Sequence, residues 1–203
     1  MTADATVYVV DDDPDVRKSL AELVSSIKLR VRSYASATEF LDDYDPTLPG
    51  CLVVDVRMPG MSGIELQEQI RRLGSDIPVI MLTGHGDVPM AVRALKSGAV
   101  DFLEKPCRAQ TLIDRIQHSL QIDAEFRAAR AKKDETAKRL ASLTERERSI
   151  AEMIASGMTT KRIAAEFGVS TQAIDAHRGR AMRKLNVDTA PALAVVVARA
   201  TTS

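Results

Sequence analysis

The sequence of 203 residues contains no tryptophan and only two cysteines, Cys51 and Cys107. Because these cysteines lie far apart and lack metal-ligand spacing, a disulfide-stapled scaffold and a cysteine zinc site are both excluded. We expect both thiols to pack in the interior of a protein that folds in a reducing compartment. The sequence also lacks the run of roughly 18 apolar residues that a membrane-spanning helix requires. No basic region precedes the first apolar run, so we expect no secretory signal and a cytoplasmic location.

The formal net charge is zero, but the charges are unevenly distributed along the chain. Residues 1–121 hold 18 Asp and Glu against 13 Lys and Arg, whereas residues 122–203 hold 10 against 15. An acidic half followed by a basic half indicates a different partner for each, and the basic half is compatible with a polyanion. The same imbalance is also typical of ordinary solvated surface, so it decides nothing by itself.

Short β-branched runs alternate with segments of helical periodicity in the first 120 residues. Several of the runs are apolar nearly throughout, as strands buried on both faces should be. Alternating β–α pairs of this kind predict an α/β doubly wound five-stranded parallel sheet. The expected strands are 5–10, 30–34, 51–55, 77–82 and 100–104, and the expected helices are 14–28, 37–44, 63–73, 87–97 and 108–121.

The segment 122–140 has neither Gly nor Pro, is rich in Ala and charge, and offers too few apolar side chains for a core of its own. We expect a helical linker that continues the preceding helix and also offers a seam for a dimer. A flexible charged tether is the alternative.

The pattern from residue 141 onward is wholly helical and predicts a small all-α module. Thr144 and Glu147 have the spacing of a capping box at a helix start, and Gly157 is placed to end that helix. Gly168 marks a tight turn, after which Ser170 is expected to cap the next helix. The expected helices are 145–156, 160–166, 171–185 and 189–200.

Charged and hydroxyl side chains follow the expected strands where each strand ends. They are Asp11, Asp12 and Asp13 after the first strand, Asp55 at the end of the third, Thr83 after the fourth and Lys105 after the fifth. Ligands of doubly wound sheets bind at these carboxyl ends, near the point where the strand order reverses. Clustered carboxylates repel one another, and hard oxygen ligands in a small site favour Mg²⁺ (or Mn²⁺). A carboxylate nucleophile, a metal, a hydroxyl and an ammonium together fit phosphoryl transfer to an aspartate.

Helix capping is the alternative role for these acids, and Asp13 before Pro14 is placed for it. Capping explains one aspartate well, but it does not account for reactive side chains at four strand ends.

Four strings in the first 120 residues resemble the receiver domains of bacterial response regulators, a flavodoxin-like fold. The strings are VVDDD, LVVDVRMPGMSG, IPVIMLTGHGD and GAVDFLEKP, and the run TGHGDVPMAV is particularly similar to the FixJ subgroup. The resemblance implies that Asp55 is the phospho-acceptor and that Thr83 and Lys105 contact the phosphate. It further implies that Mg²⁺ is held by Asp12 directly, by Asp11 through water, by Asp55 and by the backbone carbonyl of Arg57.

The resemblance also concerns two residues next to the pocket. Phe102 falls on the aromatic position that turns inward on activation. The Lys105–Pro106 bond is cis in the family, which aims the lysine at the pocket. Cys107 is a departure, because a phenylalanine commonly follows this Lys-Pro pair.

A helix, a tight turn and a second helix form the minimal reader of the DNA major groove, and residues 160–185 have this pattern. The second helix carries basic side chains spaced so that they reach phosphates on both walls of the groove. These residues are Arg178, Arg180, Arg183 and Lys184. A solvated helix face is the alternative for such a cluster.

The string ASLTERERSIAEMIASGMTTKRIAAEFGVSTQAIDAHRGRAMRKLNV resembles the LuxR/FixJ-type helix-turn-helix across nearly its whole length. The resemblance implies that Thr160 and Lys161 contact phosphate at the start of the scaffold helix. It implies a recognition face made of Thr171, Gln172, Asp175, Ala176, His177, Arg178, Gly179 and Arg180. The implied core positions are Ile163, Ala164, Val169, Ile174, Met182 and Leu185.

The residues of the recognition face favour few base contacts. Asp175 can accept from the amino group of cytosine but is repelled by phosphates, whereas Ala176 suits a thymine methyl. Gly179 offers no side chain where relatives often present one. Three neighbouring residues of the first helix are expected to hold helices together rather than touch DNA: Glu145, Arg146 and Glu147.

These residues together predict a phosphorylation-activated transcriptional response regulator rather than an enzyme. A sensor histidine kinase would phosphorylate Asp55, Thr83 would move toward the phosphate, and Phe102 would fill the vacated space. The remodelled surface 87–104 would form a homodimer that places two recognition helices on near-palindromic double-stranded DNA. RNA polymerase is a further expected partner. The sequence leaves open whether the resting chain is masked by contact between its halves or is simply monomeric.

Three other functions fit the sequence less well. A phosphatase or haloacid-dehalogenase-like hydrolase would need a second carboxylate two residues after Asp55, where this chain has Arg57. A module that binds protein or RNA is the second, but an RNA reader would offer exposed aromatics, and Phe167 alone is aromatic in 141–203. A receiver that is never phosphorylated is the third.

The predicted domains are a receiver over 1–121, a helical linker over 122–140 and a DNA-binding domain over 141–203.

Overall fold

The computed structural model describes residues 4–84, 92, 94 and 96–201. Residues 199–201 are described by their backbone only. The chain divides into two compact units, Met1–Ala128 and Ala129–Ser203. Within the described part of the chain, every helix is too short or too polar to span a bilayer.

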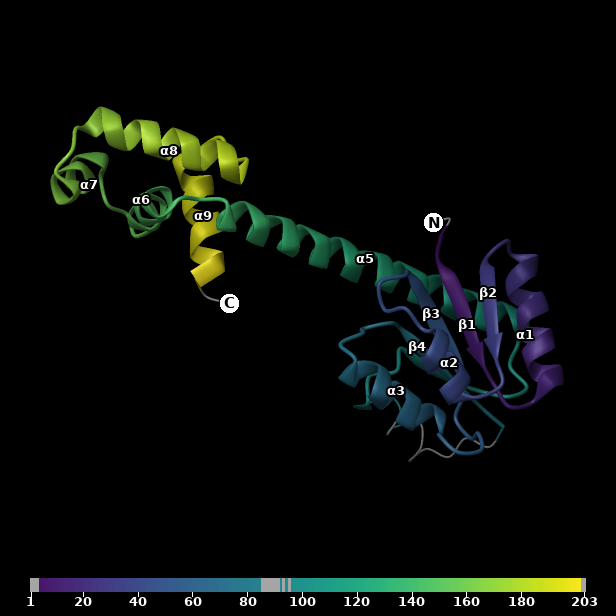
Figure 1. The fold of residues 1–203 in the computed structure, drawn as a ribbon. Coiled ribbons are helices and arrows are strands. Elements are labelled where there is room, and N and C mark those ends of the chain that lie inside the picture. Colours follow the sequence, from purple (N-terminus) through teal and green to yellow (C-terminus); the bar gives the residue numbers. More distant parts are fainter. Residues whose placement is uncertain (1–3, 85–91, 93, 95, 202–203) are drawn as a thin grey trace. The chain divides into compact units, whose positions relative to one another are not determined.

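Five parallel strands form the sheet of the first unit, in the order β2-β1-β3-β4-β5. Figure 1 shows β1 between β2 and β3. The order reverses between β1 and β3, which is the point where sheets of this type bind their ligands. This arrangement confirms the predicted doubly wound sheet. The strands are β1 Thr6–Val10, β2 Arg30–Tyr34, β3 Gly50–Asp55, β4 Val79–Thr83 and β5 Asp101–Glu104.

Helices connect these strands, and their ends follow from local chemistry. Asp13 caps α1 by accepting from the N–H groups of Asp15 and Val16, with Pro14 at the first helical position as predicted. The helix ends before the expected residue 28 because Lys28 adopts a positive φ of 61°. The expected helix 87–97 lies largely outside the described residues. The described helices are α1 Pro14–Ser26, α2 Ala37–Asp43, α3 Gly63–Arg72 and α5 Ala109–Ala141.

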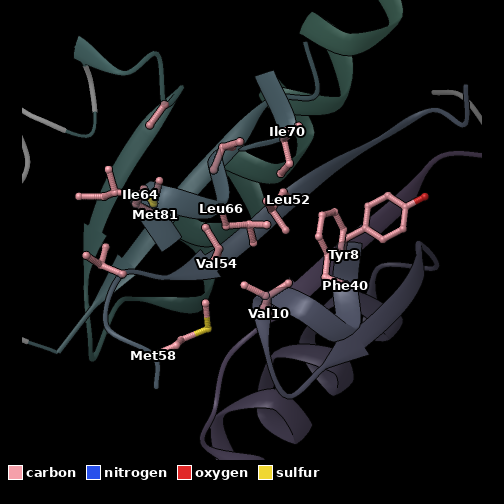
Figure 2. Close-up of a cluster of buried hydrophobic side chains, with 14 of the residues drawn as sticks. Tyr8, Val10, Phe40, Leu52, Val54, Met58, Ile64, Leu66, Ile70 and Met81 are labelled. Atoms are coloured by element: carbon pink, nitrogen blue, oxygen red, sulfur yellow. The ribbon is translucent and has the colours of Figure 1, made fainter. Parts of the chain in front are cut away.

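Apolar side chains cover both faces of the sheet. On one face, side chains of α2 and α3 pack on the strands, and Figure 2 shows Leu66 and Ile70 of α3 near Leu52 of β3. On the other face, α1 and α5 form a second cluster with residues such as Val24 and Ile116. Full burial of one such aliphatic side chain contributes about 1.5–3 kcal/mol, and β3 and β4 accordingly carry buried apolar side chains up to their last residues, Asp55 and Thr83.

Helix α5 spans both the expected helix 108–121 and the expected linker 122–140, so the linker segment is helical. Beyond residue 121 the helix is tied to the start of β3 by Asp123, which is buried and accepts from the N–H of Gly50 at 3.0 Å. Arg127 donates to Asp123 at 2.9 Å and to the carbonyl oxygen of Thr47 at 2.7 Å. The first unit therefore holds α5 past residue 121.

Four helices and the last residues of α5 make up the second unit. The predicted capping box is confirmed, since Thr144 and Glu147 bond each other's backbone N–H groups, and Ser170 caps α8 as expected. Gly168 adopts φ 64° at the turn between α7 and α8, a conformation that suits glycine. The helices are α6 Glu145–Ala155, α7 Thr160–Phe167, α8 Thr171–Leu185 and α9 Ala190–Thr201.

The core of this unit contains the expected positions. Val169 and Met182 are half-buried and pack against it. The fully buried members are Ile163, Ala164, Ile174 and Leu185.

The ends of α5 and α8 cap each other. Arg139 of α5 donates to the carbonyl oxygen of Leu185 at 3.4 Å, and Lys184 of α8 donates to that of Ser142 at 3.0 Å. Carbonyl groups at helix C-termini lack hydrogen-bond donors within the helix, and basic side chains commonly act as those donors. The last turn of α5 thus belongs to the packing of the second unit.

Glu147 is buried at the junction of α6 and α8, with 3% of its surface exposed. Its Oε2 accepts from Nζ of Lys184 at 2.6 Å, and its Oε1 lies 3.5 Å from Nε of Arg180. The hydrogen bond from Lys184, together with that from the backbone of Thr144, lowers the pKa of Glu147 to about 2. Nearby, the guanidinium of Arg146 lies 4.7 Å from the ring centre of Phe167. Both Arg146 and Glu147 thus join helices, as expected.

Glu147→Gln should destabilise the second unit by about 2 kcal/mol, because it leaves two basic groups without their shared carboxylate. The pKa of Glu147 is about 2 in the folded chain and 4.5 without its partners. The stabilisation that Glu147 gives the wild type is therefore fully present above pH 4.5. This stabilisation declines as the pH falls toward 2, so wild type and variant should differ less in free energy of unfolding at low pH. Hydrogen exchange of peptides from 145–185 in the full-length chain measures that free energy.

Glu152→Gln is the matched control, because Glu152 lies on the same helix with an exposed side chain. Its effect should stay within about 0.5 kcal/mol. Equal effects of the two substitutions would contradict the assigned role of Glu147.

Candidate functional site

The register of the sheet brings the ends of β1, β3, β4 and β5 to one edge. Val10 pairs with Val54, so Asp11 follows β1 beside the end of β3 at Asp55. Thr83 pairs with Glu104, and the N–H of Lys105 donates to the carbonyl oxygen of Thr83 at 2.7 Å. The side chains that the sequence singled out therefore come from neighbouring strand ends.

The ammonium of Lys105 bridges two carboxylates at this edge. Its Nζ donates to Oδ2 of Asp11 and to Oδ1 of Asp55, each at 2.5 Å. Both acids are buried, with 1% of Asp11 and 6% of Asp55 exposed. One cationic group thus offsets part of the negative charge of two acids that would otherwise repel each other.

Burial and charge act in opposite directions on these groups. Burial raises the pKa of Asp11, although hydrogen bonds from Lys105 and from the N–H of Asp13 oppose it. Burial alone would lower the pKa of Lys105, but the hydrogen bonds to Asp11 and Asp55 outweigh it and the pKa rises. Lys105 therefore stays protonated, and the edge of the sheet holds a permanent positive charge beside Asp55.

The other expected pocket residues differ in exposure and in contacts. Asp12 is exposed and Thr83 is buried. The N–H of Arg57 donates to the second carboxylate oxygen of Asp55 at 2.7 Å. Phe102 is half-buried and packs against the cluster under α2 and α3. The Lys105–Pro106 bond is cis, as the resemblance implied.

Both cysteines pack against apolar side chains, Cys51 in the interior as expected and Cys107 only in part. Cys51 is fully buried in β3, and burial raises the pKa of its thiol far above the usual range. Cys107 is half-buried and packs against the cluster under α1 and α5.

The donor set suits a hard divalent cation. Asp11 and Asp55 already share one cationic group, and Asp12 follows Asp11 directly. In the part of the chain that the structure describes, no three acidic, histidine or cysteine side chains form a closed metal cage. Mg²⁺ does not need one, because it commonly binds through one or two carboxylates and keeps several waters.

Sequence reasoning missed Arg17. Its Nη1 donates to the backbone carbonyl oxygen of Asp11 at 2.7 Å, from the first turn of α1. The only signal in the sequence is its place four residues after the helix cap Asp13, which says nothing about where the guanidinium points. Asp123 and Arg127, at the opposite edge of the sheet, were missed for the same reason.

The helix-turn-helix residues of the second unit lie where α7 and α8 meet solvent. Thr160 is half-buried and Lys161 is exposed at the start of α7. On α8 the exposed members of the expected face are Thr171, Gln172, Asp175, Ala176 and Arg180. The expected face is only partly open, because three members are half-buried: His177, Arg178 and Gly179.

Three of the four basic side chains of α8 have partners within the protein: Arg178, Arg180 and Lys184. Arg178 forms an ion pair with Asp175 at 3.1 Å. Arg180 lies 2.8 Å from Nδ1 of His177 and also faces Glu147, as Lys184 does. The expected row of basic residues is thus divided, with Arg180 and Lys184 turned toward α6.

Comparison with known proteins gives two family matches. Residues 7–117 match the response regulator receiver domain, and residues 141–197 match the luxR family of bacterial regulatory proteins. The chain is 43% identical to the transcriptional regulatory protein FixJ of Azorhizobium caulinodans over 187 residues, 92% of this chain and 89% of that protein. It is 39% identical to the response regulator protein TodT of Pseudomonas putida over 195 residues, 96% of this chain and 86% of that protein.

Solved structures agree with these matches. The response regulator StyR is 43% identical and superposes with a TM-score of 0.90, covering 97% of this chain and 99% of that chain. Full-length FixJ from B. japonicum is 38% identical, with a TM-score of 0.59 and 98% of each chain covered. A receiver domain implies a cognate histidine kinase, and a LuxR-type domain implies DNA binding. The chain therefore belongs to the two-component transcriptional response regulators of the FixJ family, which join a receiver domain to a LuxR-type helix-turn-helix.

Proposed function

We propose that this regulator is switched by phosphorylation of Asp55, which promotes dimerisation and sequence-specific DNA binding. The observation that carries the proposal is the Lys105 ammonium held 2.5 Å from both Asp11 and Asp55 at the strand ends. A carboxylate beside a fixed positive charge is suited to accept a phosphoryl group, because that charge offsets the negative charge of the group that arrives.

In the transfer, a carboxylate oxygen of Asp55 attacks the phosphorus of the kinase phosphohistidine. An O–P bond forms as the N–P bond to the imidazole breaks, and the imidazole retains the electron pair. Mg²⁺, or Mn²⁺, would neutralise charge on the transferring group when bound. Asp12, Asp11, Asp55 and the backbone carbonyl of Arg57 would hold it. The domain assists only its own phosphorylation and dephosphorylation, so the chain acts as a regulator rather than an enzyme with a separate substrate.

The outward signal would run through Thr83 and Phe102. The phosphate adds about two negative charges, which attract the Thr83 hydroxyl and Lys105. Phe102, now half-buried, would then turn further inward. The surface 87–104 would be remodelled and would pair with a second copy, although residues 87–91, 93 and 95 lie outside the described part of the chain.

The DNA contacts would come from α7 and α8. Thr160 and Lys161 would bind phosphate, and the exposed residues of α8 would face the major groove. Two recognition helices of a dimer would read a near-palindromic site, and RNA polymerase would be the downstream partner. The proposed contacting residues of α8 are the exposed Thr171, Gln172, Asp175, Ala176 and Arg180, together with the half-buried His177 and Arg178.

Asp55→Ala should abolish covalent labelling by a small phosphodonor such as acetyl phosphate, because the attacking oxygen is lost. Phosphate-affinity gel electrophoresis or intact-mass spectrometry measures the labelled fraction. Asp45→Ala, which removes an exposed acid from the same unit, should label like wild type. Persistent labelling of Asp55→Ala would move the acceptor to another residue.

Beryllofluoride, which mimics a phosphoryl group on aspartate, should convert the chain to a dimer in the presence of Mg²⁺. Light scattering reports the mass, and the affinity for DNA fragments selected by the protein should rise in parallel. The Asp55→Ala variant supplies the baseline. If neither mass nor affinity responds in wild type, the phospho-switch is wrong.

Arg178→Ala should weaken binding to selected DNA by about 1–3 kcal/mol, because its guanidinium serves base or backbone contacts. Labelling by acetyl phosphate should stay unchanged. Lys18→Ala removes an exposed positive charge from the receiver and controls for net charge. Equal losses of DNA affinity in both variants would argue against a direct contact by Arg178.

A further inference from the structure

The loop that follows β1 is held at four points around Asp11. The N–H of Asp11 donates to the carbonyl oxygen of Tyr34 at 3.2 Å. Its Oδ1 accepts from the N–H of Asp13 at 3.0 Å, and its Oδ2 accepts from Lys105. The fourth bond comes from α1, where Nη1 of Arg17 donates to the backbone carbonyl oxygen of Asp11 at 2.7 Å. Arg17 thus grips the main chain and leaves both carboxylate oxygens of Asp11 to other groups.

These four bonds differ in how a cation would affect them. A divalent cation at the acidic edge competes with the Lys105 ammonium for carboxylate oxygens, and Lys105 is needed on the phosphoryl group. The bonds to Tyr34 and from Arg17 involve main-chain atoms of Asp11, so the exchange of carboxylate partners does not consume them. They are the fixed points of the loop while its side chains change partners.

Arg17 lies on α1, a helix that is packed against the sheet. The first turn is closed by the N–H of Arg17, which donates to the carbonyl oxygen of Asp13 at 3.0 Å. One turn later, Leu20 is buried against the sheet, followed by Val24. A guanidinium also stays charged at all accessible pH values and forms charge-assisted bonds that are stronger than neutral ones. The helix and the loop are therefore joined by a strong bond between well-packed elements.

We propose that Arg17 is a positioning residue for the divalent cation site. By holding the carbonyl of Asp11, it keeps the carboxylates of Asp11 and Asp12 in place for the cation. The inference rests on the proposed function, because it takes these acids to hold Mg²⁺.

The charge of Arg17 predicts the opposite effect from its hydrogen bond. A positive charge near a cation site weakens cation binding by repulsion, so its removal alone would tighten the binding of Mg²⁺. If Arg17 acts by positioning, its removal weakens the binding, since groups that orient metal ligands contribute about 10–100-fold to metal affinity. The sign of the change separates the two roles.

The test measures Mg²⁺ affinity from the rise in melting temperature of the full-length chain with Mg²⁺ concentration, followed by scanning calorimetry. Arg17→Ala should bind Mg²⁺ about tenfold more weakly than wild type. Lys18→Ala, which removes an exposed charge from the next position, should bind Mg²⁺ as tightly as wild type or slightly more tightly. Arg17→Lys keeps the charge without the fork of donors and should show a smaller loss than Arg17→Ala.

Each variant is compared with its own metal-free melting temperature, so a general loss of stability does not imitate a loss of affinity. If Arg17→Ala does not fold, the loss of affinity in Arg17→Lys decides. Unchanged or tighter Mg²⁺ binding in the Arg17 variants, with Asp55 still labelled in wild type, overturns the positioning role alone. A wild-type chain that neither responds to Mg²⁺ nor is labelled at Asp55 overturns the proposed function with it.

Discussion

The receiver domain is organised around one ammonium group between two buried carboxylates. Removing Asp11 and Asp55 from water is costly, and without Lys105 their mutual repulsion would add to that cost. The compensation depends on placing a residue from the end of β5 beside residues from the ends of β1 and β3. A parallel sheet with its order reversed between β1 and β3 does this, because all of its strands end at one edge.

Much of this arrangement could be predicted from sequence, because the signals are local. Apolar runs and helical spacings fix which segments are strands and helices, and strand ends fix where Asp55, Thr83 and Lys105 meet. What could not be predicted is which groups touch. The sequence offers three adjacent acids, and packing decides that Asp11 is buried on Lys105 while Asp12 faces solvent. Arg17 is invisible for the same reason, since its partner is a main-chain atom.

The DNA-binding domain shows the same division between local and long-range information. The capping box of Thr144 and Glu147 could be predicted from the sequence because both of its bonds span three residues. The bonds from Glu147 to Arg180 and Lys184 depend on how α6 crosses α8, which no local pattern encodes. As a result, a basic row that looks uniform in sequence consists of side chains that build the domain and side chains left for a ligand.

The mutual capping of α5 and α8 affects where the chain can be divided. A fragment starting at residue 141, where the luxR-family match begins, would lack Arg139 and leave the carbonyl of Leu185 without this donor. A receiver fragment ending at residue 121 would lack Asp123 and expose the N–H of Gly50, at the far end of the strand that carries Asp55. Fragments cut near the unit boundary at 128 and 129 keep both sets of bonds, so that position inside a helix is a better place to separate the domains than residue 121 or residue 141.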